Sequence, residues 1–475
     1  MAPSSLDTSM DKIDEHEKEL GTGRTSINSP TGSDTWAQDE EKAHGRHVKE
    51  DELADALKTV PVTVPGPALE PPPDGGWFAW TQVLYGHFVV MNCWGWVQSF
   101  GVFQTYYVTA LHETASSISW IGSIQIFLLF STGMFSGRML DAGFFKVTFF
   151  TGLSLQMLGV FTLSVGTKYW HILLSAIAQG IGCGMTFTPT VAILSTYFTK
   201  RRSLVIGMAA SGSGIGGLIY PSIVRSLLPK IGYGWTVRVC GFVMLCVGLT
   251  AGLGLKTRIP PRKSGPLLEL GAFRELPYTL YCIAAFLFFF GIFFPFYYSS
   301  SFARDIVGMS YDSSAEVLMM MNGIGVISRI LPNWLADKYT GPIGVLVPCL
   351  FGTAVCTYAW AAIKTKVGIW IWAVFYGFFA GGVQGVFPSA MSSLTSDPTK
   401  QGTRIGMGFT IASIGALVGS PLGGALIQAR HGGYLYAQMW SASSIFAGGC
   451  FTLAARLVKM RIDTGRISFK ALFRR

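Results

Sequence analysis

An uncharged apolar run between Pro71 and Tyr107 constrains this chain more than any other feature. After Asp74 the run holds no Lys, Arg, Asp or Glu. At ~1.5 Å rise per residue, the roughly 28 residues from Trp80 to Tyr107 would form a helix longer than the ~30 Å core of a bilayer. The prolines and glycines before Trp77 cannot continue a helix backwards, and tryptophan suits the lipid headgroup level. The run therefore predicts a tilted first transmembrane helix.

Eleven more apolar spans follow this one. Half of the residues are apolar and 13% are charged, and this charged share is about half that of an ordinary soluble protein. The pattern predicts an all-α membrane protein with twelve transmembrane helices in two pseudo-symmetric six-helix halves. The expected spans are 80–108, 117–137, 147–166, 170–194, 204–228, 235–255, 277–299, 314–335, 343–363, 367–391, 405–428 and 434–456.

The charged residues divide the chain into tails, a linker and two apolar parts. Residues 1–70 hold 7 Lys/Arg and 15 Asp/Glu and too little apolar surface to offset the entropy of ordering, so we expect a disordered acidic cytoplasmic tail. The other expected parts are an N-terminal six-helix half at 71–255, a cytoplasmic linker at 256–276, a C-terminal six-helix half at 277–456 and a basic cytoplasmic tail at 457–475.

The positive charges also predict the orientation in the membrane. Of the 36 Lys and Arg, 27 fall on the side that carries both ends of the chain and 6 on the other side. Since cytoplasmic loops carry an excess of Lys and Arg, we expect both termini to be cytoplasmic. The plasma membrane is the first expectation for the location, and the vacuolar membrane is the alternative. The basic residues flank apolar spans and form no single patch, so no nucleic-acid partner is expected beside the lipid bilayer.

The sequence also excludes several kinds of chemistry. The eight cysteines lie within apolar spans and form no CxxC pair, so neither a disulfide framework nor a metal site is predicted. No cofactor is expected. The spans hold no carboxylate pair, His cluster or Cys-His arrangement, so we do not expect an enzyme. The sequence does not indicate whether an ancillary protein is needed.

The fifth and eleventh spans repeat each other at a distance of about 199 residues. Ile206-Gly207-Met208 opens the fifth span and Ile405-Gly406-Met407 opens the eleventh. Two parallel six-helix halves of this kind resemble the plan of the major facilitator superfamily. Glycines let helices pack closely and proline bends them, so the repeated positions predict gating hinges, with tight packing alone as the alternative. The hinge candidates are Gly216, Gly217, Pro221, Gly415 and Pro421.

Two motifs are similar to the signatures of the monocarboxylate-transporter family, in its fungal branch. DGGWFAW precedes the first helix, and YFTKRRSLVIGM enters the fifth. The likeness covers roughly Pro71 to Arg456, with two departures, Phe78-Ala79 between the tryptophans and Leu204-Val205 in the second motif. The matching signature positions are Asp74, Gly75, Gly76, Trp77, Trp80, Tyr197, Phe198, Lys200 and Arg201.

The resemblance also implies where the substrate is held. The family uses a Lys in the first helix and an Asp four residues before an Arg in the eighth, and these positions align with Gln98, Gly325 and Arg329. Only the Arg is kept. A cation in the middle of a span costs at least ~2.5 kcal/mol on insertion scales and needs an anion. We therefore expect Arg329 to contact an anionic substrate, although snorkelling to the headgroups is the alternative.

Other polar residues in the first and eighth spans are further candidates. Asn322, Gly325, Arg329 and Asn333 share one helix face in the eighth span. The first span has two polar faces, one with Asn92 and the other with His87 and Gln98. We expect His87 either to carry protons or to have a structural role. The expected substrate-binding residues are Arg329, Gln98, Asn92 and Asn322.

Two further features concern gating. The loop after the eighth span contains Asp337-Lys338, which predicts a charge relay at the cytoplasmic hinge, with ordinary loop charges as the alternative. The corresponding loop of the first half has Asp141 followed by Ala142. The aromatic run from Leu287 to Tyr298 in the seventh span faces lipid or shapes an outer gate.

These observations predict a multi-pass secondary transporter that moves a small organic acid or anion, monocarboxylate-like, by alternating access. The first alternative is an efflux pump for a larger weakly acidic secondary metabolite, and the second is a nutrient sensor on a transporter scaffold. A passive channel fits less well, because it does not need the repeated bending glycines. With neither Lys nor Asp at the family's positions, we expect facilitated diffusion, anion exchange or transport of a protonated acid.

Overall fold

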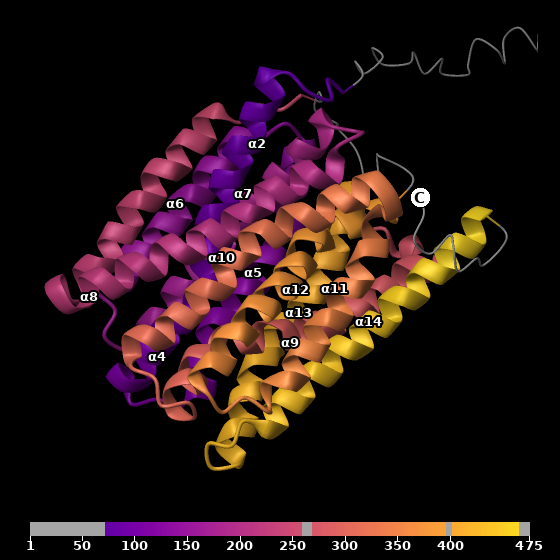
Figure 1. Cartoon of the computed structure of the whole chain (residues 1–475). Coiled ribbons are helices and arrows are strands. Elements are labelled where there is room, and N and C mark those ends of the chain that lie inside the picture. Colours follow the sequence, from indigo (N-terminus) through magenta and orange to yellow (C-terminus); the bar gives the residue numbers. More distant parts are fainter. Residues whose placement is uncertain (1–71, 259–267, 396–400, 465–475) are drawn as a thin grey trace, which may run out of the picture. The chain divides into compact units, whose positions relative to one another are not determined.

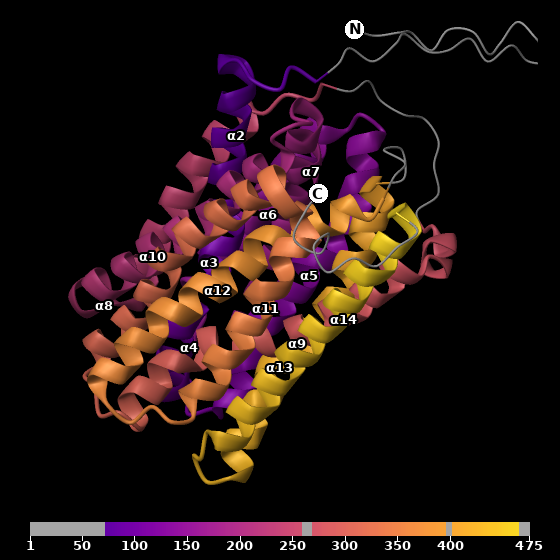
Figure 2. The same ribbon diagram turned by 45° about the vertical axis from the view of Figure 1, so that its right-hand side comes forward.

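The computed structural model describes residues 72–258, 268–395 and 401–464, and the secondary structure within these ranges is helical (Figures 1 and 2). The first pass consists of α2 (Trp77–Val90), the π-helical η1 (Met91–Gly95), α3 (Trp96–Gln98) and α4 (Phe100–Leu111). The remaining helices are α5 (Ala115–Asp141), α6 (Phe145–Leu163), α7 (Tyr169–Tyr197), α8 (Arg202–Gly254), α9 (Leu276–Asp305), α10 (Tyr311–Leu335), α11 (Gly341–Trp360), α12 (Lys366–Ser393), α13 (Gln401–Ala429) and α14 (Leu435–Thr464).

The described helices make twelve membrane passes, as the sequence predicts. Within the described ranges, nine stretches are long and apolar enough to cross a membrane, and two of these, with 53 and 50 residues, are double. Gly232, with φ 75°, breaks α8 into two passes. The other double stretch joins α10 and α11 through the short π-helix η3 (Ala336–Thr340) and Gly341, whose φ is 72°. The segmented first pass, α2 to α4, is the twelfth.

The ends of the membrane part differ in detail from the prediction. Helix α14 continues to Thr464, so the first residues of the expected C-terminal tail extend the last helix. In the expected linker, Leu270–Arg274 form the 3-10 helix η2. The expected N-terminal tail, 1–70, the linker residues 259–267 and the residues after 464 lie outside the described ranges. The proposed domain boundaries stay a prediction.

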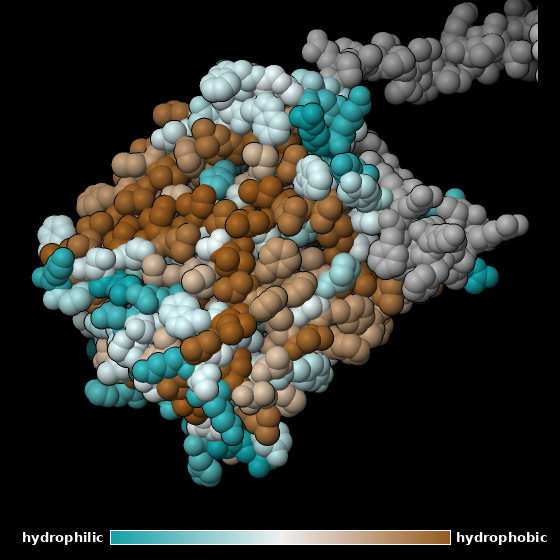
Figure 3. Space-filling view, viewed as in Figure 1, coloured by the Kyte–Doolittle hydropathy of each residue, from teal (hydrophilic) through white to brown (hydrophobic). Residues whose placement is uncertain are grey.

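The outer surface of the helices is apolar over a broad area. Figure 3 shows a wide hydrophobic region over α8, α6 and α10, with hydrophilic residues gathered toward the edges. Large apolar side chains stay exposed there and on other helices, as expected where lipid is the solvent. Examples are Phe242, Leu249, Leu253, Val355, Ile371 and Phe375.

The first six and last six passes meet along two helix pairs. Helix α5 packs against α13, and α8 packs against α10. The repeated glycines lie at equivalent contacts, because Gly216 of α8 packs against Gly95 of the first pass and Gly415 of α13 packs against Phe290 of α9, the seventh pass. A side chain at either glycine would meet neighbouring backbone, so close packing accounts for both. Gly217 instead contacts Asn322 of α10, between the two sets of helices.

Candidate functional site

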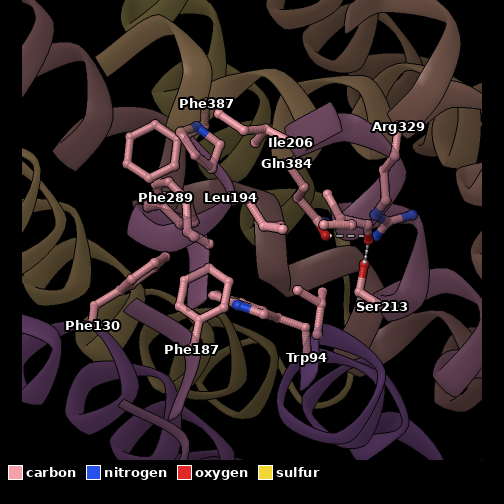
Figure 4. A pocket seen from close by; sticks show the side chains of 15 residues that line it. Trp94, Phe130, Phe187, Leu194, Ile206, Ser213, Phe289, Arg329, Gln384 and Phe387 are labelled. Atoms are coloured by element: carbon pink, nitrogen blue, oxygen red, sulfur yellow. Dashed lines mark hydrogen bonds between the residues drawn. The ribbon is translucent and has the colours of Figure 1, made fainter. Parts of the chain in front are cut away.

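A cavity lies between the two sets of six passes. Fifteen residues line it, and three of them are polar: Ser213 on α8, Arg329 on α10 and Gln384 on α12. Figure 4 shows these three on one side of the cavity and a group of aromatic rings on the other. The cavity is therefore amphipathic, with one polar end.

Arg329 carries the only charge among the described residues that line the cavity. Its side chain is buried, with 1% of the residue exposed. Nη2 donates a hydrogen bond of 2.8 Å to the side-chain oxygen of Gln384. Nε and Nη1 are buried and have no hydrogen-bond partner among the described residues. A buried guanidinium with two unused donor nitrogens, and with no carboxylate beside it in the described part of the chain, is ready to bind an anion.

Gln384 is a site residue that the sequence analysis missed. Its oxygen accepts a hydrogen bond from Arg329 and a second, of 2.5 Å, from Nε2 of Gln98. These two bonds join the first, eighth and tenth passes. The sequence feature that could have indicated Gln384 is an amide among closely spaced glycines in an apolar span. One of those glycines, Gly385, packs so closely that a side chain there would meet the Arg329 backbone. That feature does not say which helix faces which.

The polar face predicted on the eighth span is buried against the other set of helices. Nδ2 of Asn322 lies 3.4 Å from the carbonyl oxygens of Gln98 and Gly217, while its Oδ1 has no partner among the described groups. Asn333 donates to the carbonyl of Arg329 at 2.8 Å. Three of the four predicted substrate-binding residues, Arg329, Gln98 and Asn322, therefore form one connected polar group with Gln384.

Asn92, the fourth, lies elsewhere. Its Nδ2 donates to the carbonyl of Met244 at 2.7 Å, and its Oδ1 accepts from the Tyr220 hydroxyl at 3.0 Å. Both partners are on α8, and Asn92 does not line the cavity. Both polar atoms of the Asn92 side chain thus have a hydrogen-bond partner on α8. A role for Asn92 in substrate binding stays a prediction.

The two signature motifs contact each other at the side of the bundle where α2 begins, called the inner side because the charges predict it to be cytoplasmic. Asp74 accepts hydrogen bonds from the backbone N–H groups of Thr199, at 2.5 Å, and Lys200, at 2.9 Å. These bonds, the Thr199 bond first, hold the pKa of Asp74 below its usual value. Trp80 packs on Phe198 with ring centroids 5.2 Å apart. The motifs thus fasten the start of the first helix to the loop before the fifth.

The other signature residues have simpler places. Gly76, with φ 85°, occupies a backbone conformation that other residues rarely adopt, just before α2. Trp77 is exposed and Tyr197 is buried. None of these residues lines the cavity, so their contacts support a structural role close to the inner side.

Asp337 joins the two sets of helices on the inner side. One carboxylate oxygen accepts from the backbone N–H of Ser203 at 3.2 Å, and the other accepts from that of Leu204 at 2.8 Å. These N–H groups belong to the first turn of α8, where the helix dipole favours a negative charge. The contact joins the first set of helices to the second.

The two sets of helices are joined on the outer side as well. Arg225 of α8 pairs with Glu316 of α10 at 2.6 Å. Ser116 of α5 donates to the carbonyl of Pro421 on α13 at 2.9 Å, and the hydroxyls of Ser119 and Tyr298 lie 2.6 Å apart. Pro221, one of the hinge candidates, is buried within α8. The two sets of helices are thus joined on the inner side, on the outer side and, through the Gln98–Gln384 bond, at the centre.

Removing the charge of Asp337 should loosen the inner side. We expect Asp337→Asn to increase the rate at which a thiol reagent labels Ala210→Cys, which replaces a cavity-lining residue, by about tenfold in the purified protein, since bonds to a charged acceptor contribute ~1.5–3 kcal/mol. Asp463→Asn, which removes a carboxylate on the exposed end of α14, is the matched control and should leave the rate unchanged. Equal labelling with and without Asp337→Asn would show that this contact does not hold the two sets of helices together.

Comparisons with known proteins agree with this fold. The family model for the Major Facilitator Superfamily matches residues 85–396. An MFS-type transporter of Gibberella zeae is 44% identical over 82% of this chain and 89% of its own. The aspyridones efflux protein apdF of Emericella nidulans is 34% identical over 82% of this chain and 80% of its own.

Solved structures show the same architecture. The human organic anion transporter MFSD10 (TETRAN) superposes with a TM-score of 0.62 at 12% identity, covering 79% of this chain and 99% of its own. A variant of the E. coli fucose:proton symporter FucP gives 0.57 at 17% identity, covering 80% and 98%. The relatives are transporters and not enzymes, as the sequence predicts. The chain thus belongs to the Major Facilitator Superfamily and is a multi-pass membrane transporter.

Proposed function

We propose that the protein exports a weakly acidic organic compound by alternating access and holds the anionic group of this cargo with Arg329, Gln384 and Gln98. The observation that carries the proposal is the buried guanidinium with two unused donors and no carboxylate beside it among the described residues. Such a charge is costly at membrane depth unless an anion joins it. The cargo would supply that anion.

The Gln384 side chain suggests how cargo binding and opening are linked. Its oxygen occupies the place next to Nη2 of Arg329 that an anionic oxygen would take. A carboxylate there would add ion pairing and bidentate geometry, which the neutral amide oxygen cannot supply to the guanidinium. Displacing the amide oxygen would also break its bond to Gln98, which is one of the hydrogen bonds between the two sets of helices. Cargo binding would therefore weaken the contact between the two sets of helices at the centre of the protein.

The cavity lining favours a larger, mostly apolar cargo over a small monocarboxylate. Twelve of the fifteen described residues that line the cavity are apolar, and sites lined mainly by apolar and aromatic side chains are typical for drug-sized ligands. Export as the direction is supported by the relative named as an efflux protein. The second candidate is transport of a small monocarboxylate, supported by the contact between the two signature motifs. Cytoplasmic termini and a plasma-membrane location complete the proposal.

A comparison of metabolites inside and outside cells tests export. We expect cells that lack the gene to retain an acidic compound that wild-type cells release, and cells that overproduce the protein to release more of it. Overproduction of Arg329→Gln at the same abundance should give no increase. A released profile that does not change in any of the three strains would contradict export of an acid by this protein.

A further inference from the structure

Five aromatic side chains are among the residues that line the cavity and are called the aromatic box: Trp94, Phe130, Phe187, Phe289 and Phe387. The first three come from the first six passes, and Phe289 and Phe387 come from the last six. Figure 4 shows Phe130, Phe187, Phe289 and Phe387 grouped together, away from Arg329. The aromatic run in the seventh span, which contains Phe289, therefore does not simply face lipid, and Phe289 itself is buried.

The rings of the box contact one another across the two sets of helices. Phe130 lies 5.5 Å from Phe289 and 6.2 Å from Phe387 between ring centroids, both in edge-to-face geometry. Within each set, Trp94 lies 5.0 Å from Phe130, and Phe289 lies 4.8 Å from Phe387. Aromatic rings prefer such contacts through their quadrupoles, beyond the gain from burial alone.

Alternating access moves the two sets of helices relative to each other, so we expect it to disturb the contacts that Phe130 makes with Phe289 and Phe387 across the sets. A saturated cargo would compensate for these ring contacts only by burying apolar surface. A flat unsaturated cargo would replace them by new stacked or edge-to-face contacts on both sides. Cargo of that kind would thus recover the ring contacts that the moving helices lose.

The rest of the cavity wall agrees with an amphipathic cargo. Twelve of its fifteen residues are apolar, and the three polar ones lie at one end. Ser213 already donates to the Ala210 carbonyl at 2.7 Å, whereas Arg329 and Gln384 have buried nitrogens whose donors are unused among the described residues. A cargo with polar groups along its whole length would leave them unpaired against this wall.

We propose that the cargo is an organic acid with one anionic head and a flat aromatic or conjugated body, the head at Arg329 and Gln384 and the body in the aromatic box. This inference rests on the proposed function and adds the chemical class of the cargo. The preference for an unsaturated body comes from the ring contacts, and the preference for an anion comes from the guanidinium.

Three probes of matched size separate these two preferences. Binding to the purified wild-type protein is measured by calorimetry for 2-naphthoate, decahydro-2-naphthoate and 2-naphthamide. The first two differ in unsaturation, and the first and third differ in charge. We expect 2-naphthoate to bind roughly tenfold more tightly than the saturated acid, and the neutral amide to bind at least as weakly as the saturated acid.

Variants locate the preference in the box. Phe289→Leu and Phe387→Leu keep an apolar side chain and should reduce the ratio between the naphthoate and decahydronaphthoate affinities, roughly threefold or more. Phe351→Leu removes a ring that pairs with exposed Phe446 outside the cavity and should leave the ratio unchanged. An unchanged ratio in both box variants would overturn the assignment of the body to the box.

The remaining outcomes distinguish the inference from the function on which it rests. Equal binding of the two acids, lost in both cases in Arg329→Gln, would overturn the aromatic class and leave the proposed acid site standing. Binding of neither acid, or binding that Arg329→Gln leaves intact, would overturn the proposed function together with the inference.

Discussion

Transport by Arg329→Gln should fall about a hundredfold or more while the protein still reaches its membrane. Glutamine keeps some hydrogen-bonding capacity but removes the charge, and each lost bond to a charged group is worth ~1.5–3 kcal/mol. Arg329→Lys should recover only part of the rate, because an ammonium cannot make the paired, planar contacts of a guanidinium with a carboxylate. Release of labelled 2-naphthoate from loaded cells, normalised to protein abundance, measures both.

Arg238→Gln is the matched control for this experiment. Arg238 also lies in a span, but its Nε donates to Ser164 at 3.2 Å and its guanidinium stacks on Trp235, away from the cavity. Its loss should change the rate less than twofold. Nearly normal transport by Arg329→Lys, or by the Gln variant, would favour a structural or headgroup role for Arg329.

A carboxylate placed at Gly325 should make transport depend on pH. A Cβ at this position would meet Nη1 of Arg329, so the carboxylate of Gly325→Asp would pair with the guanidinium one turn away and compete with the cargo. We expect transport of naphthalene-2-sulfonate, whose charge is constant, to fall at least tenfold at pH 7.5. It should rise again as the pH falls, because protonation of the new carboxyl releases Arg329.

Gly325→Asn separates the effect of charge from that of size. The asparagine side chain fills the same space without a titrating group, so its transport rate should be lowered by a constant factor from pH 7.5 to pH 4.5. The wild-type rate should be flat over this range. A flat profile in Gly325→Asp as well would show that position 325 does not face the anion, and that its alignment with the family's Asp is wrong.

The membrane passes could be predicted from sequence because the physics behind them is local. Charge is excluded from lipid, so the uncharged spans had to coincide with helices, and the Gly-rich repeat showed that the halves are related. The helix ends were less certain. Helix α14 ends only at Thr464, so the basic residues that follow the last apolar span continue the same helix beyond the lipid.

The candidate site could be predicted only in part, because it is built from contacts between distant segments. Arg329 stood out through its cost at membrane depth, and Gln98 through the resemblance. Gln384 carries no charge and matches no motif, and its role follows only from its hydrogen bonds to both of these residues. Conversely, Asn92 has a polar side chain on an apolar helix, but its partners on α8 cannot be read from helix periodicity.

His87 was the one titratable residue that the sequence analysis left open as a proton carrier. Its Nδ1 lies 3.0 Å from the carbonyl oxygen of Met208, and a carbonyl only accepts, so Nδ1 donates there. Ser211 contacts the same nitrogen at 3.3 Å. His87 does not line the cavity, and these contacts favour the structural interpretation.

The central claim is that Arg329 binds the cargo as a permanent cation and that no titrating residue couples transport to protons. Uptake into proteoliposomes under a pH gradient tests this claim most directly. Labelled naphthalene-2-sulfonate should enter vesicles that contain the wild-type protein and equilibrate to equal concentrations, with or without the gradient, and should not enter vesicles with Arg329→Gln. Accumulation above the outside concentration, driven by the gradient in the wild-type protein, would contradict this expectation. Its loss in His87→Ala would identify His87 as the proton carrier.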